Sequence, residues 1–222
     1  MPRILVIAAH PHLGDSRVTR ALIDAARAAA AEGADIAVRE LYALYPDYLI
    51  DTAAEQAALR EAALLVWLHP IHWYGMPPLM KLWLDEVFAF GWAYGPGGTA
   101  LAGRDLWLVC STGGSAESYQ PAGHNRHAFE AFLPPYAQAA ALVGLRFLPP
   151  QVLHGAHQAD GAAVTAFAQG FVARLRSWPE ASAWPELAGL PPCPGCTVPG
   201  GERPAEAPGS VTLAATTRRV EA

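Results

Sequence analysis

Three segments of the sequence contain residue types suited to binding an anion and a flat ring. Ser16 precedes a helix-forming run, and the free backbone N–H groups at a helix N-terminus attract anions. Trp73 and Tyr74 offer flat apolar surface. Gly113 and Gly114 lack side chains, so backbone N–H groups there can come close to a planar ligand. Together these residues predict a site for a phosphorylated, planar aromatic molecule.

The elements that must position these residues are strands. Each segment follows a short apolar run, at residues 3–9, 64–68 and 105–111, of the kind that forms a strand buried on both faces. In an open parallel sheet, ligands bind outside the carboxyl ends of the strands, where the strand order reverses. We therefore expect the three segments to meet in one cleft, and flavin mononucleotide (FMN) is the ligand that meets all three requirements.

The rest of the chain alternates between strand and helix patterns. This alternation predicts an α/β fold, a doubly wound parallel sheet of five strands with right-handed crossovers. Ser16 is the expected N-cap of the first helix, and Pro134 and Pro135 are expected to interrupt the fourth. The further expected elements are strands at residues 35–41 and 145–153, helices at 16–33, 53–61, 77–90, 127–142 and 160–178, and a loop at 42–52.

The character of the sequence changes near Trp178. Residues 1–178 are expected to form one domain, and residues 179–222 are rich in Pro, Gly, Ala and Thr without hydrophobic periodicity, which predicts a disordered, flexible tail. Cys193 and Cys196 form a lone Cys-x-x-Cys in this tail. Zinc would need two more ligands, so no metal site is predicted there.

Composition excludes several classes of protein. Of the 222 residues, 52% are hydrophobic and 16% charged, which is enough for a sizeable core. The net charge of −5 and the lack of a basic run argue against a nucleic-acid partner. No apolar stretch has the length of a transmembrane helix, and three cysteines do not make a disulfide framework. These features predict a cytoplasmic protein.

Several motifs in the same order resemble one enzyme family. The motifs AHP at residues 9–11, PIHWYGMPPLMKLW at 70–83 and STGG at 111–114 resemble flavodoxin-like NAD(P)H:quinone oxidoreductases of the DT-diaphorase type. LYALYPD at residues 41–47 and GWAYG at 91–95 are similar to the bacterial ancillary oxidoreductases of glutathione-gated potassium efflux systems. The resemblance covers residues 1–178.

The resemblance implies a fold, an activity and a set of partners. The fold is flavodoxin-like, with strand order 2-1-3-4-5, and the protein is a homodimer. The cofactor is FMN in preference to FAD, and hydride passes from NAD(P)H through the flavin to a quinone. A potassium efflux transporter is an implied partner, which would place the protein at the cytoplasmic face of the inner membrane.

The resemblance also assigns roles to residues. Tyr119 and His124 are the implied catalytic residues, assisting protonation of the quinone, although the spacing differs by one residue and His127 competes for the role. The implied FMN-binding residues are His10, Ser16, Arg17, Val18 and Thr19 near the phosphate, and Ile71, His72, Trp73, Tyr74, Ser111, Thr112, Gly113 and Gly114 around the ring.

Two positions depart from the family pattern. Thr19 stands where the family usually has Asn, and keeps a hydroxyl for a phosphate oxygen. His72 stands where the family usually has Gln, and it would titrate near neutral pH. Each change is expected to weaken the binding of FMN without preventing it.

Two other functions compete with this prediction. A zinc-dependent deacetylase-like hydrolase also ends its first strand in Ala-His-Pro, but it continues with paired acidic residues, whereas Asp15 stands alone here. A non-catalytic flavin-binding subunit that regulates a transporter would have the same motifs as the enzyme.

Overall fold

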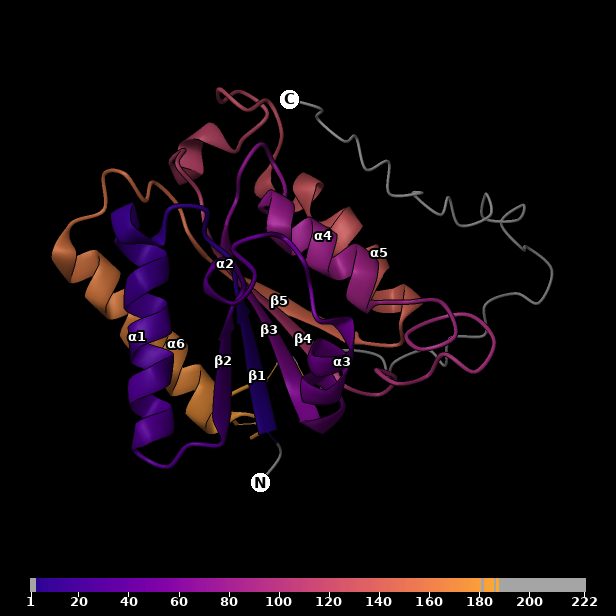
Figure 1. The fold of residues 1–222 in the computed structure, drawn as a ribbon. Helices are drawn as coiled ribbons and strands as arrows, with labels where there is room; N and C mark the ends of the chain where they lie inside the picture. The colour runs from indigo at the N-terminus through magenta and orange to yellow at the C-terminus, as the bar shows by residue number, and fades with distance from the viewer. Residues whose placement is uncertain (1–2, 181, 186, 188–222) are drawn as a thin grey trace, which may run out of the picture.

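The fold is built on a parallel sheet of five strands (Figure 1). The computed structural model describes residues 3–180, 182–185 and 187. The sheet has the order β2-β1-β3-β4-β5, and all neighbouring strands run parallel. The predicted fold class and strand order are therefore confirmed. The strands are β1 (Arg3–Ala8), β2 (Ile36–Glu40), β3 (Ala62–Pro70), β4 (Asp105–Ser111) and β5 (Arg146–Leu153).

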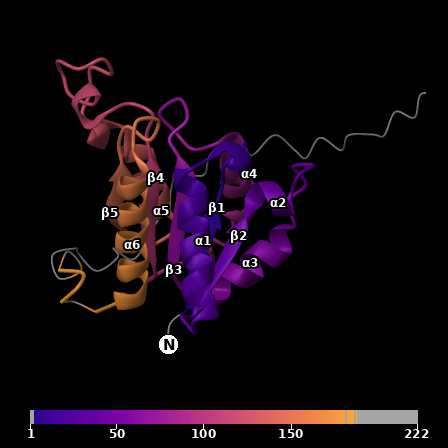
Figure 2. The same cartoon turned by 90° about the vertical axis from the view of Figure 1, so that its left-hand side faces the viewer.

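Helices cover both faces of the sheet, as Figures 1 and 2 show. Helices α1 (Val18–Ala31) and α6 (Gly161–Ser177) pack side by side on one face. Helices α3 (Thr52–Glu61), α4 (Pro78–Val87) and α5 (Pro134–Leu142) cover the other. This arrangement explains why β3 and β4 are almost continuously apolar, because both of their faces are covered.

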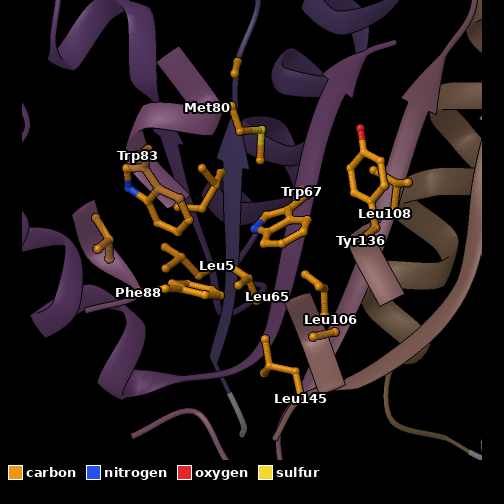
Figure 3. Packing of buried hydrophobic residues seen from close by; sticks show 14 of the residues in the cluster. Leu5, Leu65, Trp67, Met80, Trp83, Phe88, Leu106, Leu108, Tyr136 and Leu145 are labelled. Atoms are coloured by element: carbon orange, nitrogen blue, oxygen red, sulfur yellow. The ribbon is translucent and has the colours of Figure 1, made fainter. Parts of the chain in front are cut away.

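The α3–α5 side of the sheet holds a core rich in aromatic side chains (Figure 3). Trp67 of β3 and Trp83 of α4 are both fully buried and both pack against Phe88. Tyr136 of α5 contacts Trp67 with ring centroids 6.1 Å apart. All four rings belong to the core, and for Trp67 and Trp83 their positions within apolar periodic segments predict this.

The strand order places a reversal between β1 and β3. From β1 the chain first builds β2 on one side, then crosses to β3 on the other side of β1. The loops that follow β1 and β3 therefore leave neighbouring strands in opposite directions, which opens a crevice at their carboxyl ends. This crevice is where the sequence predicts the ligand site.

Local structure differs from the expectation in three places. The predicted helix over 127–142 is a 3₁₀ turn, η3 (Phe129–Phe132), followed by α5, because Pro134 occupies the first turn of the helix and begins it. The predicted loop at 42–52 starts with a short helix, α2 (Leu41–Leu44). The N-cap of α1 is Arg17 instead of Ser16.

The packed part of the chain extends past residue 178, where the tail was expected to begin. Trp184 is fully buried against Trp107 of β4, with ring centroids 5.0 Å apart, and the guanidinium of Arg174 lies 3.8 Å from the Trp184 ring centroid. Residues Cys193 and Cys196 lie outside the described residues.

Candidate functional site

The loop after β1 leads into the N-terminus of α1, which is suited to binding an anion. The Oγ of Ser16 accepts a hydrogen bond from the N–H of Thr19 at 3.1 Å, so Ser16 still satisfies one N–H of the first turn of α1. The Nδ1 of His10 lies 3.1 Å from the backbone nitrogen of His12. A backbone N–H can only donate, so a neutral His10 carries its proton on Nε2, where it is a donor for a ligand.

The turn after β3 is a tight one with an unusual composition. The N–H of His72 donates to the carbonyl of Gly75, and the N–H of Gly75 donates back, both at 3.0 Å. Trp73 and Tyr74 between them have φ values of 48° and 65°. Two successive positive φ values are the geometry of a type I′ turn, which normally selects Asn and Gly. Bulky side chains held in this conformation are strained, and such strain is concentrated at functional sites.

The turn leaves its aromatic rings outside the core. Trp73 is 94% exposed, the largest exposure among the large hydrophobic side chains of the described residues. Tyr74 stacks on Phe132 with centroids 4.9 Å apart and donates a hydrogen bond from its hydroxyl to Asn125 Oδ1 at 3.3 Å. The indole of Trp73 is thus exposed, whereas the phenol of Tyr74 is held by its contacts with Phe132 and Asn125.

Histidine rings join the first two loops. The rings of His10 and His72 meet edge to face with centroids 5.9 Å apart. Burial and the positive charge that His72 and His12 can carry lower the pKa of His10. Burial, followed by the influence of His12, also lowers the pKa of His72. The neutral forms are therefore favoured at neutral pH, and the pair becomes cationic only in more acidic solution.

The loop after β4 brings backbone donors to the same edge. Within the hydrogen bonds formed by the described residues, the N–H groups of Gly113 and Gly114 have no partner. A Cβ on Gly113 would lie 3.0 Å from Nε2 of His157, and a Cβ on Gly114 would lie 2.5 Å from Oγ of Ser118. A larger residue at either position would have to displace one of these side chains, whereas glycine leaves the backbone donors accessible to a ligand.

The turn after β3 and the loop after β4 form one open cavity of about 410 Å³. Its size falls in the usual range for ligand sites. Six predicted site residues come together in it, and two residues that the sequence reasoning missed complete it. The predicted residues are Ile71, Trp73, Tyr74, Gly114, Tyr119 and His124, and the missed residues are Ser118 and Asn125.

The two candidate proton donors lie in this cavity. Tyr119 is mostly buried, and its pKa is raised by burial first and by Tyr74 second, while Thr112 lowers it. The phenol therefore keeps its proton at neutral pH. His124 lines the cavity, whereas His127 does not and instead contacts Phe132 with centroids 6.1 Å apart. The geometry thus favours His124 over His127 as the second proton donor.

The remaining predicted site residues lie beside the cavity or beneath it. His10, His72 and Gly113 are at the same edge of the sheet but do not line the cavity. The side chains of Val18, Thr19, Ser111 and Thr112 are buried, Thr19 with only 2% of its surface exposed. Arg17 is exposed and donates to the carbonyl of Ala159, which ties the loop after β1 to the loop after β5.

The loop after β5 is a part of the site that the sequence analysis missed. His154 and His157 lie in this loop, next to Thr112 and Gly113 respectively. The signal was available in the sequence, because β5 also ends at the carboxyl edge of the sheet. Asn125 and Ser118 gave no such signal, since only the folding of the loop around Tyr119 brings them to the cavity.

The geometry agrees with what comparison with known proteins shows. Residues 2–175 match the model of the family Flavodoxin_2, described as having a flavodoxin-like fold. The chain belongs to this family. Among solved structures, this Flavodoxin_2 chain is 38% identical to general stress protein 14 of Treponema denticola in complex with FMN, with a TM-score of 0.72 over 78% of this chain and 98% of that one.

Two further structures are similar to this Flavodoxin_2 chain. One, from Streptomycin violaceusniger and named as a thermophilic tryptophan halogenase, is 37% identical with a TM-score of 0.71 over 75% of this chain and 95% of that one. The other, an NADPH-quinone reductase of P. pentosaceus, is 22% identical with a TM-score of 0.68 over 77% and 95%. The names of these proteins indicate different activities, so the activity of this chain has to be inferred from the residues of its own site.

The described residues of this chain contain neither a cluster of metal ligands nor a helix that could span a membrane. Across residues 3–180, 182–185 and 187, no three His, Cys, Asp or Glu side chains are grouped as metal ligands would be. Within the same residues, none of the helices combines the length and apolar character needed to cross a bilayer.

Proposed function

We propose that this protein is an FMN-dependent NAD(P)H:quinone oxidoreductase. The observation that carries the proposal is the cavity in which aromatic walls from the turn after β3 face the glycine loop after β4, with Tyr119 and His124 beside them. The 38% identical structure in complex with FMN supports FMN as the ligand of this cavity.

The residues of the site fit the two ends of FMN. For the phosphate, the N-terminus of α1, the guanidinium of Arg17 and Nε2 of His10 are donors from the loop after β1 and the start of the helix. For the ring, Gly114 lines the cavity beside Trp73 and Tyr74, and the N–H groups of Gly114 and of its neighbour Gly113 have no partner among the described residues. The N–H groups of Trp73 and Tyr74 likewise have no partner among the described residues. A planar ligand with polar edges matches this combination.

FMN, when bound, supplies the transfer of hydride from NAD(P)H and of two electrons to the quinone. The chain supplies position and protons. The N–H groups of the glycine loop are fixed donors for a polar edge of the ligand. Tyr119 stays protonated because its pKa is raised, so it can donate a hydrogen bond to a quinone oxygen. The exposed indole of Trp73 offers flat apolar surface to the ligand.

The finer parts of the proposal rest on sequence motifs. LYALYPD and GWAYG support a place among the ancillary oxidoreductases of glutathione-gated potassium efflux systems. In that role the protein is a homodimer that docks on the transporter at the cytoplasmic face of the inner membrane. A purely regulatory, non-catalytic flavin subunit is the alternative, and only activity separates the two.

The test is a titration followed by an assay. We expect the purified protein to quench the fluorescence of added FMN in a saturable manner, and the complex to oxidise NADH or NADPH only when a quinone is present. Binding of FMN without oxidation of either nicotinamide would favour the regulatory alternative. A protein that does not bind FMN would contradict the proposal.

A further inference from the structure

The loops after β4 and β5 are joined by backbone hydrogen bonds. The N–H of Thr112 donates to Leu153, the N–H of Gly155 donates to Gly114, and the N–H of Ala156 donates to Thr112, at 2.9, 2.8 and 2.8 Å. One pair of side chains joins the loops as well. The Oγ1 of Thr112 lies 2.9 Å from Nδ1 of His154.

The position of each proton in this contact follows from the neighbouring atoms. Oγ1 of Thr112 also lies 2.8 Å from the carbonyl oxygen of Gly114. A carbonyl oxygen can only accept, so the single hydroxyl proton of Thr112 points to Gly114. Oγ1 must then accept from His154, and Nδ1 of His154 carries a proton. Both the neutral tautomer with Nδ1–H and the imidazolium satisfy this requirement, so the bond persists across the titration of His154.

This chain of two hydrogen bonds restrains a segment that has no side chains of its own. The bond from Thr112 to the Gly114 carbonyl closes a small ring around Gly113. Glycine residues have the most conformational freedom to lose on binding a ligand, so an external restraint matters most here. The ring of His154 also packs against Tyr119, with centroids 5.4 Å apart, and against Phe129 at 5.2 Å.

We propose that His154 is a positioning residue for the FMN site. It acts through Thr112, whose hydroxyl it orients, and thereby presets the N–H groups of Gly113 and Gly114 and the ring of Tyr119 before the ligand binds. The proposal rests on the proposed function. It adds to the site His154 from the loop after β5, a residue that does not itself line the cavity.

The experiment measures FMN affinity by fluorescence titration in four variants. His154→Phe keeps the ring packing but removes the donor, and Thr112→Val removes the hydroxyl. We expect each to weaken FMN binding by about tenfold, the usual effect of losing one buried hydrogen bond. The double variant should be no weaker than either single one, because both break the same chain. His154→Gln, which restores a donor, should recover most of the affinity.

A control and a second readout separate positioning from damage to the fold. Thr165→Val removes a similar hydroxyl bond, from Thr165 to the carbonyl of Gly161 on α6, at 2.8 Å. It should bind FMN as the wild type does. Nitrogen-15 NMR of the ligand-free protein should find His154 protonated at Nδ1, and thermal unfolding should confirm that the variants are folded.

Two results would overturn the inference. One is undiminished FMN binding by folded His154→Phe, and the other is a neutral His154 with its proton on Nε2 alone. A wild-type protein that does not bind FMN would instead overturn the proposed function together with this inference, so the two failures are distinguishable.

Discussion

At the scale of single residues, histidines gather at one edge of the molecule. The histidines follow or end strands β1, β3, β4 and β5, and they are His10, His12, His69, His72, His124, His127, His154 and His157. His69 differs from the others because it is buried. Its Nδ1 lies 2.9 Å from the carbonyl of Pro70, and its ring stacks on Tyr136 with centroids 5.8 Å apart.

His69 should make stability depend on pH. Burial lowers its pKa from 6.5 to about 4. Below pH 6.5 the unfolded chain takes up a proton on this residue and the folded protein does not, so stability that is complete above pH 6.5 is lost as the pH falls toward 4. Between pH 7 and pH 5 we expect His69 to remove about 2 kcal/mol from the free energy of unfolding.

The comparison that isolates this effect is His69→Phe, measured by urea unfolding at both pH values. The variant keeps a ring against Tyr136 and lacks the titrating group, so its stability should fall less than that of the wild type. Equal losses of stability in the two proteins would show that His69 takes up its proton in the folded protein as readily as in the unfolded chain, which would contradict the lowered pKa.

At the scale of elements, a buried carboxylate holds one side of the sheet together. Glu55 of α3 is fully buried and accepts hydrogen bonds from Arg39 of β2, from the hydroxyl of Tyr45 and from Trp83 of α4. The nitrogen–oxygen distances are 2.7 Å to Arg39 Nε and 2.9 Å to Trp83 Nε1. The carboxylate thus sets how α3, α4 and the segment after α2 lie against β2.

Removing this carboxylate should destabilise the protein strongly. Glu55→Ala leaves three buried or half-buried donors without an acceptor, and we expect a loss of about 3–5 kcal/mol in the free energy of unfolding. The control is Asp85→Asn, which breaks the exposed pair between Lys81 and Asp85 and should cost less than about 0.5 kcal/mol. Urea unfolding measures both, and similar losses would contradict the importance of the buried network.

At the scale of the whole molecule, Trp184 closes the core beside α6. Trp184→Ala should lower the free energy of unfolding by about 3–5 kcal/mol, because it removes a fully buried indole that packs on Trp107 and Arg174. Trp73→Ala removes an indole that is 94% exposed, and should change stability by less than about 0.5 kcal/mol. Thermal or urea unfolding tests the pair, and a small effect at Trp184 would argue against its place in the core.

The proposed homodimer is a further prediction at this scale. Leu49 is 75% exposed and Phe90 is 65% exposed, so both apolar side chains are available to a second copy of the chain. We expect sedimentation to give twice the chain mass of 23.6 kDa, and Leu49→Lys to shift the protein toward monomer without loss of stability. A wild-type mass of a single chain at micromolar concentration would contradict the dimer.

Much of this architecture could be predicted from the sequence because the signals are local. Apolar runs predict the strands β1, β3 and β4, and the helix expected over residues 77–90 forms as α4, with a proline in its first turn. Prediction failed where two local signals competed. Pro134 was expected to break a helix that it instead begins, and Ser16 satisfies a backbone N–H of α1 from one position before the true N-cap.

Hydrophobic runs, and the motifs that the chain shares with its family, were enough to predict the sheet, its strand order and the loops that bear the ligand-binding residues. Which side chains meet could be learned only from the folded protein. His154 reaches Thr112 across 42 positions of the chain, and Asn125 reaches Tyr74 across 51. The physical reason is that hydrogen bonds depend on distances and proton positions, which exist only once loops from separate strands have been folded against one another.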